Sequence, residues 1–168
     1  GTGSTLLDIS IGDARISDCA FGGGSDQLET HFANVQLAQV VFGDAHDDAL
    51  SAEGGLVNAK AVEVRSARGI AIKAIKGARV QAEEVQVLRS GTGFEGREGA
   101  RLQVTGLRLD AVERVAEAKK EELRYGPVKI DLTKVQGDVD PARFKCASGS
   151  TIRVDGKKVG EGKAVKGT

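Results

Sequence analysis

The sequence repeats itself with a period in the low twenties, and this repeat restricts the fold more than any other feature. One pair of apolar residues, two positions apart, recurs at steps of 21, 22, 23, 22 and 23 residues. This first row comprises Cys19/Phe21, Val40/Phe42, Val62/Val64, Val85/Val87, Leu107/Leu109 and Ile130/Leu132. A second row, five residues upstream, comprises Ala14/Ile16, Val35/Leu37, Val57/Ala59, Val80/Ala82 and Leu102/Val104. A third, looser row comprises Leu28, Leu50, Ile72, Phe94 and, as a further candidate, Ala116.

Within each row the apolar residues alternate with mostly polar ones, which is the pattern of a strand with one buried face. Each period therefore holds about three short strands. Local hairpins cannot bury three such faces in register, whereas a coil can, because it stacks equivalent residues about 4.8 Å apart. A leucine-rich repeat has a similar period but needs Leu at fixed short offsets and an Asn turn, and neither recurs. The sequence therefore predicts an all-β fold, a parallel β-helix (solenoid) of about five to six rungs.

The repeat also predicts which side chains are buried and where the coil turns. The first-row residues from Val40 to Leu109 should form one stacked core. Gly77 and Gly99 share one position of the repeat, so they should lie in equivalent corners, at least one of them with a positive φ. The charged residues between the apolar positions should form solvated outer faces. These residues are Lys60, Glu63, Arg65, Glu83, Glu84, Arg89, Arg108 and Asp110.

The chain is long enough for one domain with a continuous core, which we assign to residues 5–160. Within it, residues 5–110 should form regular rungs, and residues 111–160 an irregular last rung and a C-terminal cap. Residues 1–4 and 161–168 are expected to be tails.

Two stretches after Leu109 depart from the regular pattern. Residues 111–124 are either a charged amphipathic helix or, through Val115, a continuation of the third row, and the sequence leaves both alternatives open. Residues 143–159 have the pattern of a strand, a turn and a hairpin-like end.

Composition excludes several classes of function. Acidic and basic residues balance at 24 each, which removes the usual electrostatic argument for binding nucleic acid or an anionic membrane. No apolar run approaches the roughly 18 residues of a membrane span. The only cysteines, Cys19 and Cys146, provide no metal-binding spacing and no disulfide framework, so we expect a buried Cys19 and an incidental Cys146. His31 and His46 are too few for a metal-binding trio and should lie on the surface.

The chain contains several short sequence motifs, some of which repeat. They are Ser25–Leu28, Asp47–Ser51, Ala67–Ala71, Lys119–Lys120 with Tyr125–Pro127, and Gly149–Gly156. On these motifs, over residues 5–160, the chain resembles bacterial right-handed β-helix repeat proteins of the pectate-lyase-like superfamily, in a poorly characterised branch. The resemblance implies a right-handed coil and an extracellular or cell-envelope location. At three positions where this branch often has Asp, the chain has Glu29, Ser51 and Arg68 instead. Any chemistry that the Asp residues perform in relatives is therefore not carried over to this chain.

The densest group of polar side chains lies between two predicted strands and contains Asp44, Asp47 and Asp48. In the superfamily that the chain resembles, lyases use Asp clusters to hold a calcium ion on an acidic sugar, with an Arg or Lys as the base. Carboxylate oxygens are the hard ligands that calcium prefers. Arg65, Arg68 and Lys73 follow one rung later and could approach the cluster.

Three interpretations of this cluster remain open. Asp44, Asp47 and Asp48 are calcium candidates; with Arg68 they are also candidate catalytic residues, because hydrolases of this fold use Asp pairs as acid and base. The simplest interpretation is an Asp-rich turn that bonds its own backbone, and we prefer it. Sugar grooves usually present Trp or Tyr, and the chain has no Trp and one Tyr, which counts against a glycan enzyme.

The segment from Gly91 to Gly96 matches GxGxxG, the fingerprint of dinucleotide-binding proteins. That motif works only between a strand and a helix whose N-terminus meets the pyrophosphate, and here another strand pattern follows at Arg101. We therefore interpret the segment as a turn of the β-helix and expect no bound cofactor.

The leading hypothesis is a non-catalytic structural or interaction module within a larger protein or assembly. The repeat begins abruptly, so the first rung should expose a strand edge and apolar side chains around Ile9, Ile11, Ile16 and Cys19. We expect a protein partner or an upstream domain to cover this N-terminal end. The alternatives are a secreted polysaccharide lyase or hydrolase that uses the cluster from Asp44 to Asp48, and a glycan-binding module without turnover.

Overall fold

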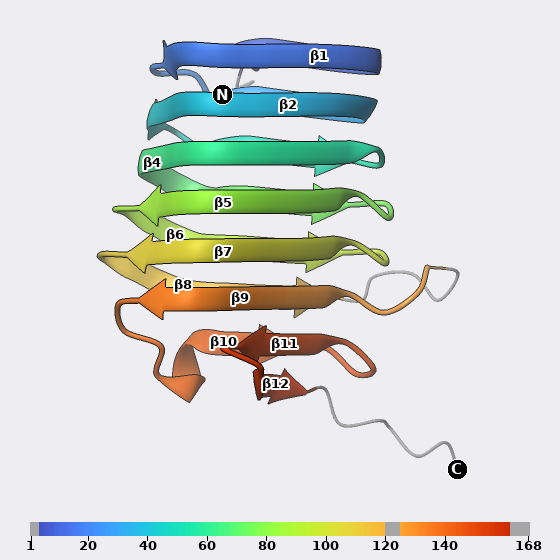
Figure 1. Cartoon of the computed structure of the whole chain (residues 1–168), viewed down its shortest axis with the longest axis vertical. Coiled ribbons are helices and arrows are strands. Elements are labelled where there is room, and N and C mark those ends of the chain that lie inside the picture. Colours follow the sequence, from blue (N-terminus) through green and yellow to red (C-terminus); the bar gives the residue numbers. More distant parts are fainter. Residues whose placement is uncertain (1–3, 120–124, 162–168) are drawn as a thin grey trace.

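A computed structural model describes residues 4–119 and 125–161 and shows a parallel β-solenoid of about six turns (Figure 1). A short 3₁₀ turn, η1 (Pro141–Arg143), precedes β10. The strands are β1 (Leu7–Phe21), β2 (Leu28–Ala45), β3 (Leu50–Glu53), β4 (Leu56–Ile75), β5 (Arg79–Val87), β6 (Ser90–Arg97), β7 (Arg101–Leu109), β8 (Val112–Lys119), β9 (Lys129–Gln136), β10 (Phe144–Cys146), β11 (Thr151–Val154) and β12 (Lys157–Glu161).

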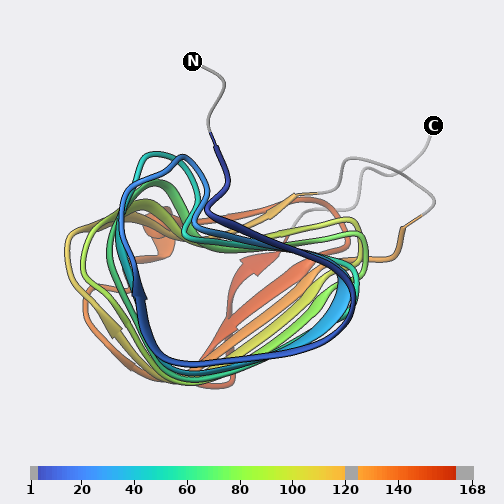
Figure 2. The same ribbon diagram turned by 90° about the horizontal axis from the view of Figure 1, so that it is seen from above.

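The strands stack in parallel along one axis. One stack runs β1, β2, β4, β5, β7, β9 and β11, and a second runs β2, β3, β4, β6, β8 and β10. Among the described strands, only β11 and β12 pair antiparallel. Seen from the N-terminal end, the chain winds clockwise as it recedes, which makes the coil right-handed (Figures 1 and 2).

The first and second rows have the register that the repeat predicts, from β1 to β7. Cys19 pairs with Val40, and the same row continues through Val62 and Val85 to Leu107. The first-row residues from Val40 to Leu109 are all buried in one core, which confirms the prediction.

The assignment of Ile130 and Leu132 to the first row is wrong. Ile130 pairs with Leu102, so both residues belong to the second row, and Val135 instead continues the first row opposite Leu107. The rung that contains residues 120–124 is longer than its predecessors by about the five residues that separate the two rows. An insertion of this size moves one apolar pair into the position expected for the other.

The third row is confirmed from Leu28 to Phe94, and Ala116 continues it. The structure also decides between the two alternatives for the segment after Leu109, because residues 112–119 form strand β8 with Val115 fully buried. The part of that segment at 120–124 lies outside the described residues, as do the tails at 1–3 and 162–168.

Two kinds of corner connect the rows. Gly77 and Gly99 lie in equivalent corners with φ of 74° and 76°, as predicted, because Arg79 pairs with Arg101 immediately after them. The corner between the second and first rows is instead made by one residue in the left-handed region, and most of these residues are not glycine. They are Asp18, Gln39, Ala61, Glu84, Gly106 and Lys134.

Candidate functional site

The predicted acidic cluster occupies a corner between β2 and β3. Asp44 is exposed on β2 opposite Ser66, whereas Asp47 is exposed and Asp48 is buried in the corner itself. The structure therefore brings Asp47 and Asp48 together and leaves Asp44 on the strand.

Asp48 belongs to a ladder of carboxylates that the sequence did not identify as a unit. Asp26 occupies the equivalent corner one rung earlier, and its Oδ1 accepts a hydrogen bond from the backbone N–H of Asp48 at 3.1 Å. Asp48 Oδ1 accepts from the N–H of Ile70 at 2.9 Å, and its Oδ2 lies 2.9 Å from Lys73 Nζ. The side chains thus satisfy backbone donors of the next rung, which agrees with the preferred interpretation of an Asp-rich turn.

The electrostatics of this corner are dominated by burial. Removal of the Asp48 carboxyl from water raises its pKa, and the hydrogen bond from Lys73 partly offsets this effect. Lys73 is the cation that reaches Asp48; Arg68 is exposed one rung later. Gly69 permits the close packing, because a Cβ there would lie 2.3 Å from Asp47 Oδ1 and 2.8 Å from Asp48 Oδ1.

Asp26, Asp47 and Asp48 are the residues of this corner that could hold a metal ion. One oxygen from each lies within 4.8 Å of the others. Calcium takes six to eight oxygen ligands, and here Lys73 already occupies one oxygen of Asp48. The calcium site and the catalytic roles of Asp44, Asp47, Asp48 and Arg68 remain predictions.

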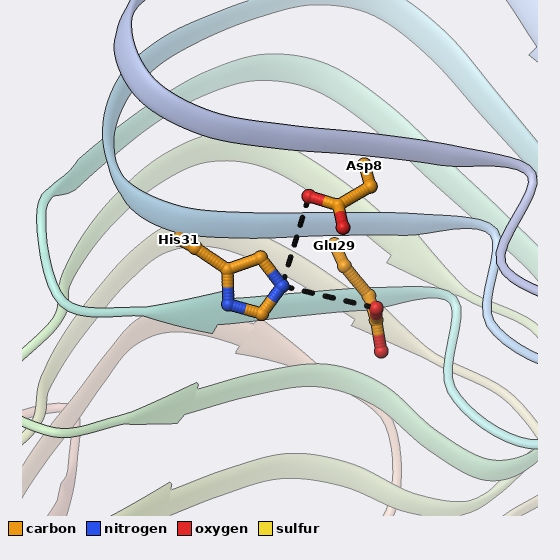
Figure 3. Close-up of side chains that lie close together, drawn as sticks. All are labelled: Asp8, Glu29 and His31. Atoms are coloured by element: carbon orange, nitrogen blue, oxygen red, sulfur yellow. Dashed lines mark ion pairs between the residues drawn. The ribbon is translucent and has the colours of Figure 1, made fainter.

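A second group of titratable side chains surrounds His31, which the sequence predicted only as a surface residue (Figure 3). Its Nε2 lies 3.7 Å from Asp8 Oδ1 and 3.9 Å from Glu29 Oε2, and its Nδ1 lies 3.6 Å from Glu53 Oε2. One donor atom each from Asp8, Glu29 and His31 lies within 4.8 Å of the others, so these residues could also hold a cation. Glu53 accepts a hydrogen bond from Lys76 Nζ at 2.6 Å, which raises the pKa of Lys76.

A third group is a network of buried acids on the outer side of β6 and β8. Glu95 and Glu117 are only 2% and 4% exposed. Glu95 pairs with Arg97 and, at 2.7 Å, with Lys119; Glu117 pairs with Arg114 at 2.9 Å. Every acid in this group has a basic partner, which indicates a structural role. The period-2 pattern could not reveal it, because these acids occupy positions that the pattern predicts to be solvated.

The outer face of the second row is a polar surface with shallow hollows. The hollows are lined by residues of successive strands, including Arg79 with Arg101 on one part of the face and Arg15 with Lys60 on another. Amide side chains form a line across the rungs between them, one from each of β2, β4, β5 and β7. They are Gln36, Asn58, Gln81 and Gln103. The signal of this line in the sequence is an amide residue that recurs one rung apart.

The N-terminal end of the solenoid is the largest unpaired edge of the described chain. β1 is 15 residues long and pairs with β2, and no described strand pairs with its other side. Its apolar residues are only partly buried, whereas their partners in β2 are at most 2% exposed. The partly buried residues include Ala14, Ile16, Cys19 and Phe21, opposite Val35, Leu37, Val40 and Phe42.

The exposed large apolar side chains of the described residues also gather at this end. Leu6 is 44% exposed, Ile11 80% and Phe32 58%, and all three lie in the first two rungs. Ile11 and Phe32 have φ of 56° and 52°, at the corner position that Gly54, Lys76 and Glu98 occupy in later rungs, also with positive φ. The first two rungs thus place an apolar side chain where later rungs have Gly or a charged residue, and the β-branched Ile11 is strained in this conformation.

The C-terminal end is closed by the chain itself. The hairpin of β11 and β12 lies inside the outline of the coil in Figure 2, and Val159 packs against the core. Ile152 and Val154 are consequently buried, unlike their counterparts in β1. The free edge of β12 is short and carries Lys157 and Lys158, features that discourage further strand pairing.

Comparison of the chain with protein-family models, with curated proteins and with solved structures gave no match. The β-solenoid is therefore established by the structure, whereas the relation to the pectate-lyase-like superfamily remains a prediction from the sequence motifs. Within the described residues, no helix has the length and apolar character to cross a membrane. Residues 91–96 lie in strand β6, so the GxGxxG match is a strand rather than the predicted turn, and β7 rather than a helix follows it. Cys19 and Cys146 are half-buried and are not bonded to each other.

Proposed function

We propose that this protein is a non-catalytic interaction module that docks an extended polypeptide on the open edge of its first rung. The observation that carries the proposal is β1, a 15-residue strand with one side unpaired and its apolar residues half-exposed. A strand edge offers a row of unpaired N–H and C=O groups, and addition of another strand satisfies them. The same addition covers the apolar side chains that the core leaves exposed.

The contrast between the two ends supports docking at the first rung. Natural proteins protect free edges with short strands, lysines or covering segments, and the C-terminal end has all three. Within the described residues, β1 is long, carries no Lys and has no covering strand, and the exposed Leu6, Ile11 and Phe32 extend the apolar surface around it.

The acidic corner supports a structural role more than a catalytic one. Asp48 is engaged by a backbone N–H and by Lys73, which leaves it poorly placed to act on a substrate. An extracellular or cell-envelope location and a polysaccharide ligand are proposed from the family resemblance alone.

Sedimentation velocity across a wide concentration series tests the proposal. We expect the wild-type protein to associate as its concentration rises, and Ile16→Lys to remain monomeric because it places a charge at the open end of the core. Ser17→Lys is the matched control, since it adds the same charge to the outward side of β1. Circular dichroism would verify that both variants fold. A wild-type protein that stays monomeric at every concentration would contradict the proposal.

A further inference from the structure

We propose that the polypeptide docked on β1 is β1 of a second copy, running antiparallel and centred on Ala14. This inference rests on the proposed function and names its partner. It rests on the sequence of β1, in which apolar residues are placed symmetrically about Ala14 along the unpaired edge of the strand.

Most of the apolar residues of β1 that face the core are symmetric about Ala14; the exception is Ile16, whose counterpart is Gly12. Leu7 and Phe21 lie seven residues on either side of it, and Ile9 and Cys19 lie five residues on either side. All five face the core and are partly buried. Residues directly opposite each other in an antiparallel pair project to the same side of the sheet. With Ala14 facing Ala14 of the other copy, Leu7 therefore meets Phe21 and Ile9 meets Cys19, while Ile16 lies opposite Gly12, which has no side chain.

The charges that flank Ala14 select this register. Asp13 and Arg15 are exposed on the outer side of the strand, one residue before and one residue after Ala14. An antiparallel pair centred on Ala14 places Asp13 of each copy opposite Arg15 of the other, which forms two equivalent ion pairs. The next register that keeps apolar residues inward is centred on Arg15, and it places the two Arg15 side chains against each other. Like charges directly opposite across a strand pair are destabilising.

The geometry of the rung is compatible with a two-fold axis through Ala14. The third-row part of β1, with Leu7 and Ile9, and its first-row part, with Cys19 and Phe21, lie on the two faces that flank the face of Ala14. A rotation about Ala14 exchanges those two faces. Because the C-terminal end of the described chain offers only the short, lysine-bearing edge of β12, head-to-tail stacking is disfavoured, and the expected assembly is a dimer with one self-complementary interface.

Disulfide trapping tests this register directly. In a Cys146→Ser background, Ile9→Cys places a thiol opposite Cys19 of the other copy, at a Cα separation of roughly 4.5 to 5.5 Å, which a disulfide accepts. We expect mild oxidation to give a covalent dimer on a non-reducing gel. The control combines Ile9→Cys with Phe21→Cys and Cys19→Ser in the same background, because these two core-facing positions lie opposite each other only in the register centred on Arg15. Cys19 alone should give no covalent dimer.

Charge exchange on the exposed side of β1 provides a second test that leaves the core intact. Arg15→Asp should weaken dimerisation by about tenfold, because Asp13 would then face another carboxylate in both of the equivalent pairs. The double variant Asp13→Arg with Arg15→Asp should restore it.

The outcomes separate this inference from the proposed function. A covalent dimer with Ile9→Cys and rescue by the double variant support the register. Trapping by the Ile9→Cys and Phe21→Cys pair instead, or association in the centrifuge with neither disulfide, overturns the Ala14-centred dimer while the edge remains a docking surface. A protein that is monomeric throughout overturns both.

Discussion

Val64→Asp measures how strictly the stacked core defines the fold. Val64 is fully buried in β4, between Phe42 of the preceding rung and Val87 of the following one, and both neighbours are fully buried as well. The substitution therefore replaces an apolar side chain by a carboxyl group at a position with no access to water.

The expected loss of stability has two parts. Loss of the buried Val side chain costs about 2 kcal/mol. The carboxyl must also stay protonated inside the core, and protonation of a group with an unfolded pKa of about 3.9 costs about 4 kcal/mol at pH 7. The free energy of unfolding should thus fall by about 6 kcal/mol at pH 7, a large share of the stability of an ordinary domain.

The pH dependence provides the sharper assay. The folded Val64→Asp variant holds a proton that the unfolded chain releases above about pH 4, so its stability should fall by about 1.4 kcal/mol for each pH unit above that value. Val64→Asn is the control, since it adds a polar group of similar size that does not titrate in this range. Urea unfolding of both variants from pH 4 to 7 would show the slope. Equal slopes, or a loss below about 1 kcal/mol at pH 7, would mean that Val64 does not face the core.

Four further predictions concern the corners and the acidic cluster. Asp48→Ala should destabilise the protein by about 2 to 4 kcal/mol in urea unfolding, because it leaves the buried N–H of Ile70 unpaired. Asp48→Asn should cost less, because its side chain still offers an acceptor to that N–H. Equal losses for the two variants would contradict this role of Asp48. Burial raises the pKa of Asp48 in the folded chain, so the stability that this carboxyl contributes should be lost as pH rises above its unfolded pKa. As pH falls from 7 to 4, the wild type should therefore become more stable relative to Asp48→Asn. Gly55→Ala should lower the melting temperature far more than Gly77→Ala, because a Cβ at Gly55 would lie 2.1 Å from the Ala33 carbonyl oxygen. A Cβ at Gly77 meets nothing within 4 Å, so that substitution should cost only about 1 kcal/mol, from its positive φ. Calcium should leave the melting temperature unchanged, because Lys73 already occupies Asp48; a rise that EDTA reverses and Asp47→Asn removes would establish the cation site instead.

The fold was largely predictable because its periodicity lies in the apolar residues. Strand alternation and a constant period specify a coil without any knowledge of contacts, and the register from Cys19 to Leu107 followed from them. The period failed at Ile130, where an insertion about equal to the spacing of two rows kept the apolar pattern while shifting its register. The left-handed corners at residues such as Gln39 and Lys134 were not predictable either, because their side chains give no hint of a positive φ.

The candidate sites were only partly predictable, because they depend on neighbours one rung away. The sequence grouped Asp44 with Asp47 and Asp48 by proximity along the chain, whereas the coil places Asp26, 22 residues before Asp48, in the same corner. The repeated motif that ends in Leu28 and Leu50 contained this information, since each copy has an Asp two residues before the Leu. The group around His31 could not be recognised in this way, because its members come from three rungs and share no motif.

The account depends most on the claim that the edge of β1 is the docking surface, and backbone hydrogen exchange measures that edge directly. Exchange followed by mass spectrometry in dilute and concentrated protein would report each strand separately. We predict that amides of residues 7–21 exchange more slowly at high concentration, since the outer edge of β1 becomes hydrogen-bonded, while peptides from β5 and β12 exchange at unchanged rates. Unchanged exchange in residues 7–21 at concentrations where the protein associates, with protection gained on another strand, would contradict the claim.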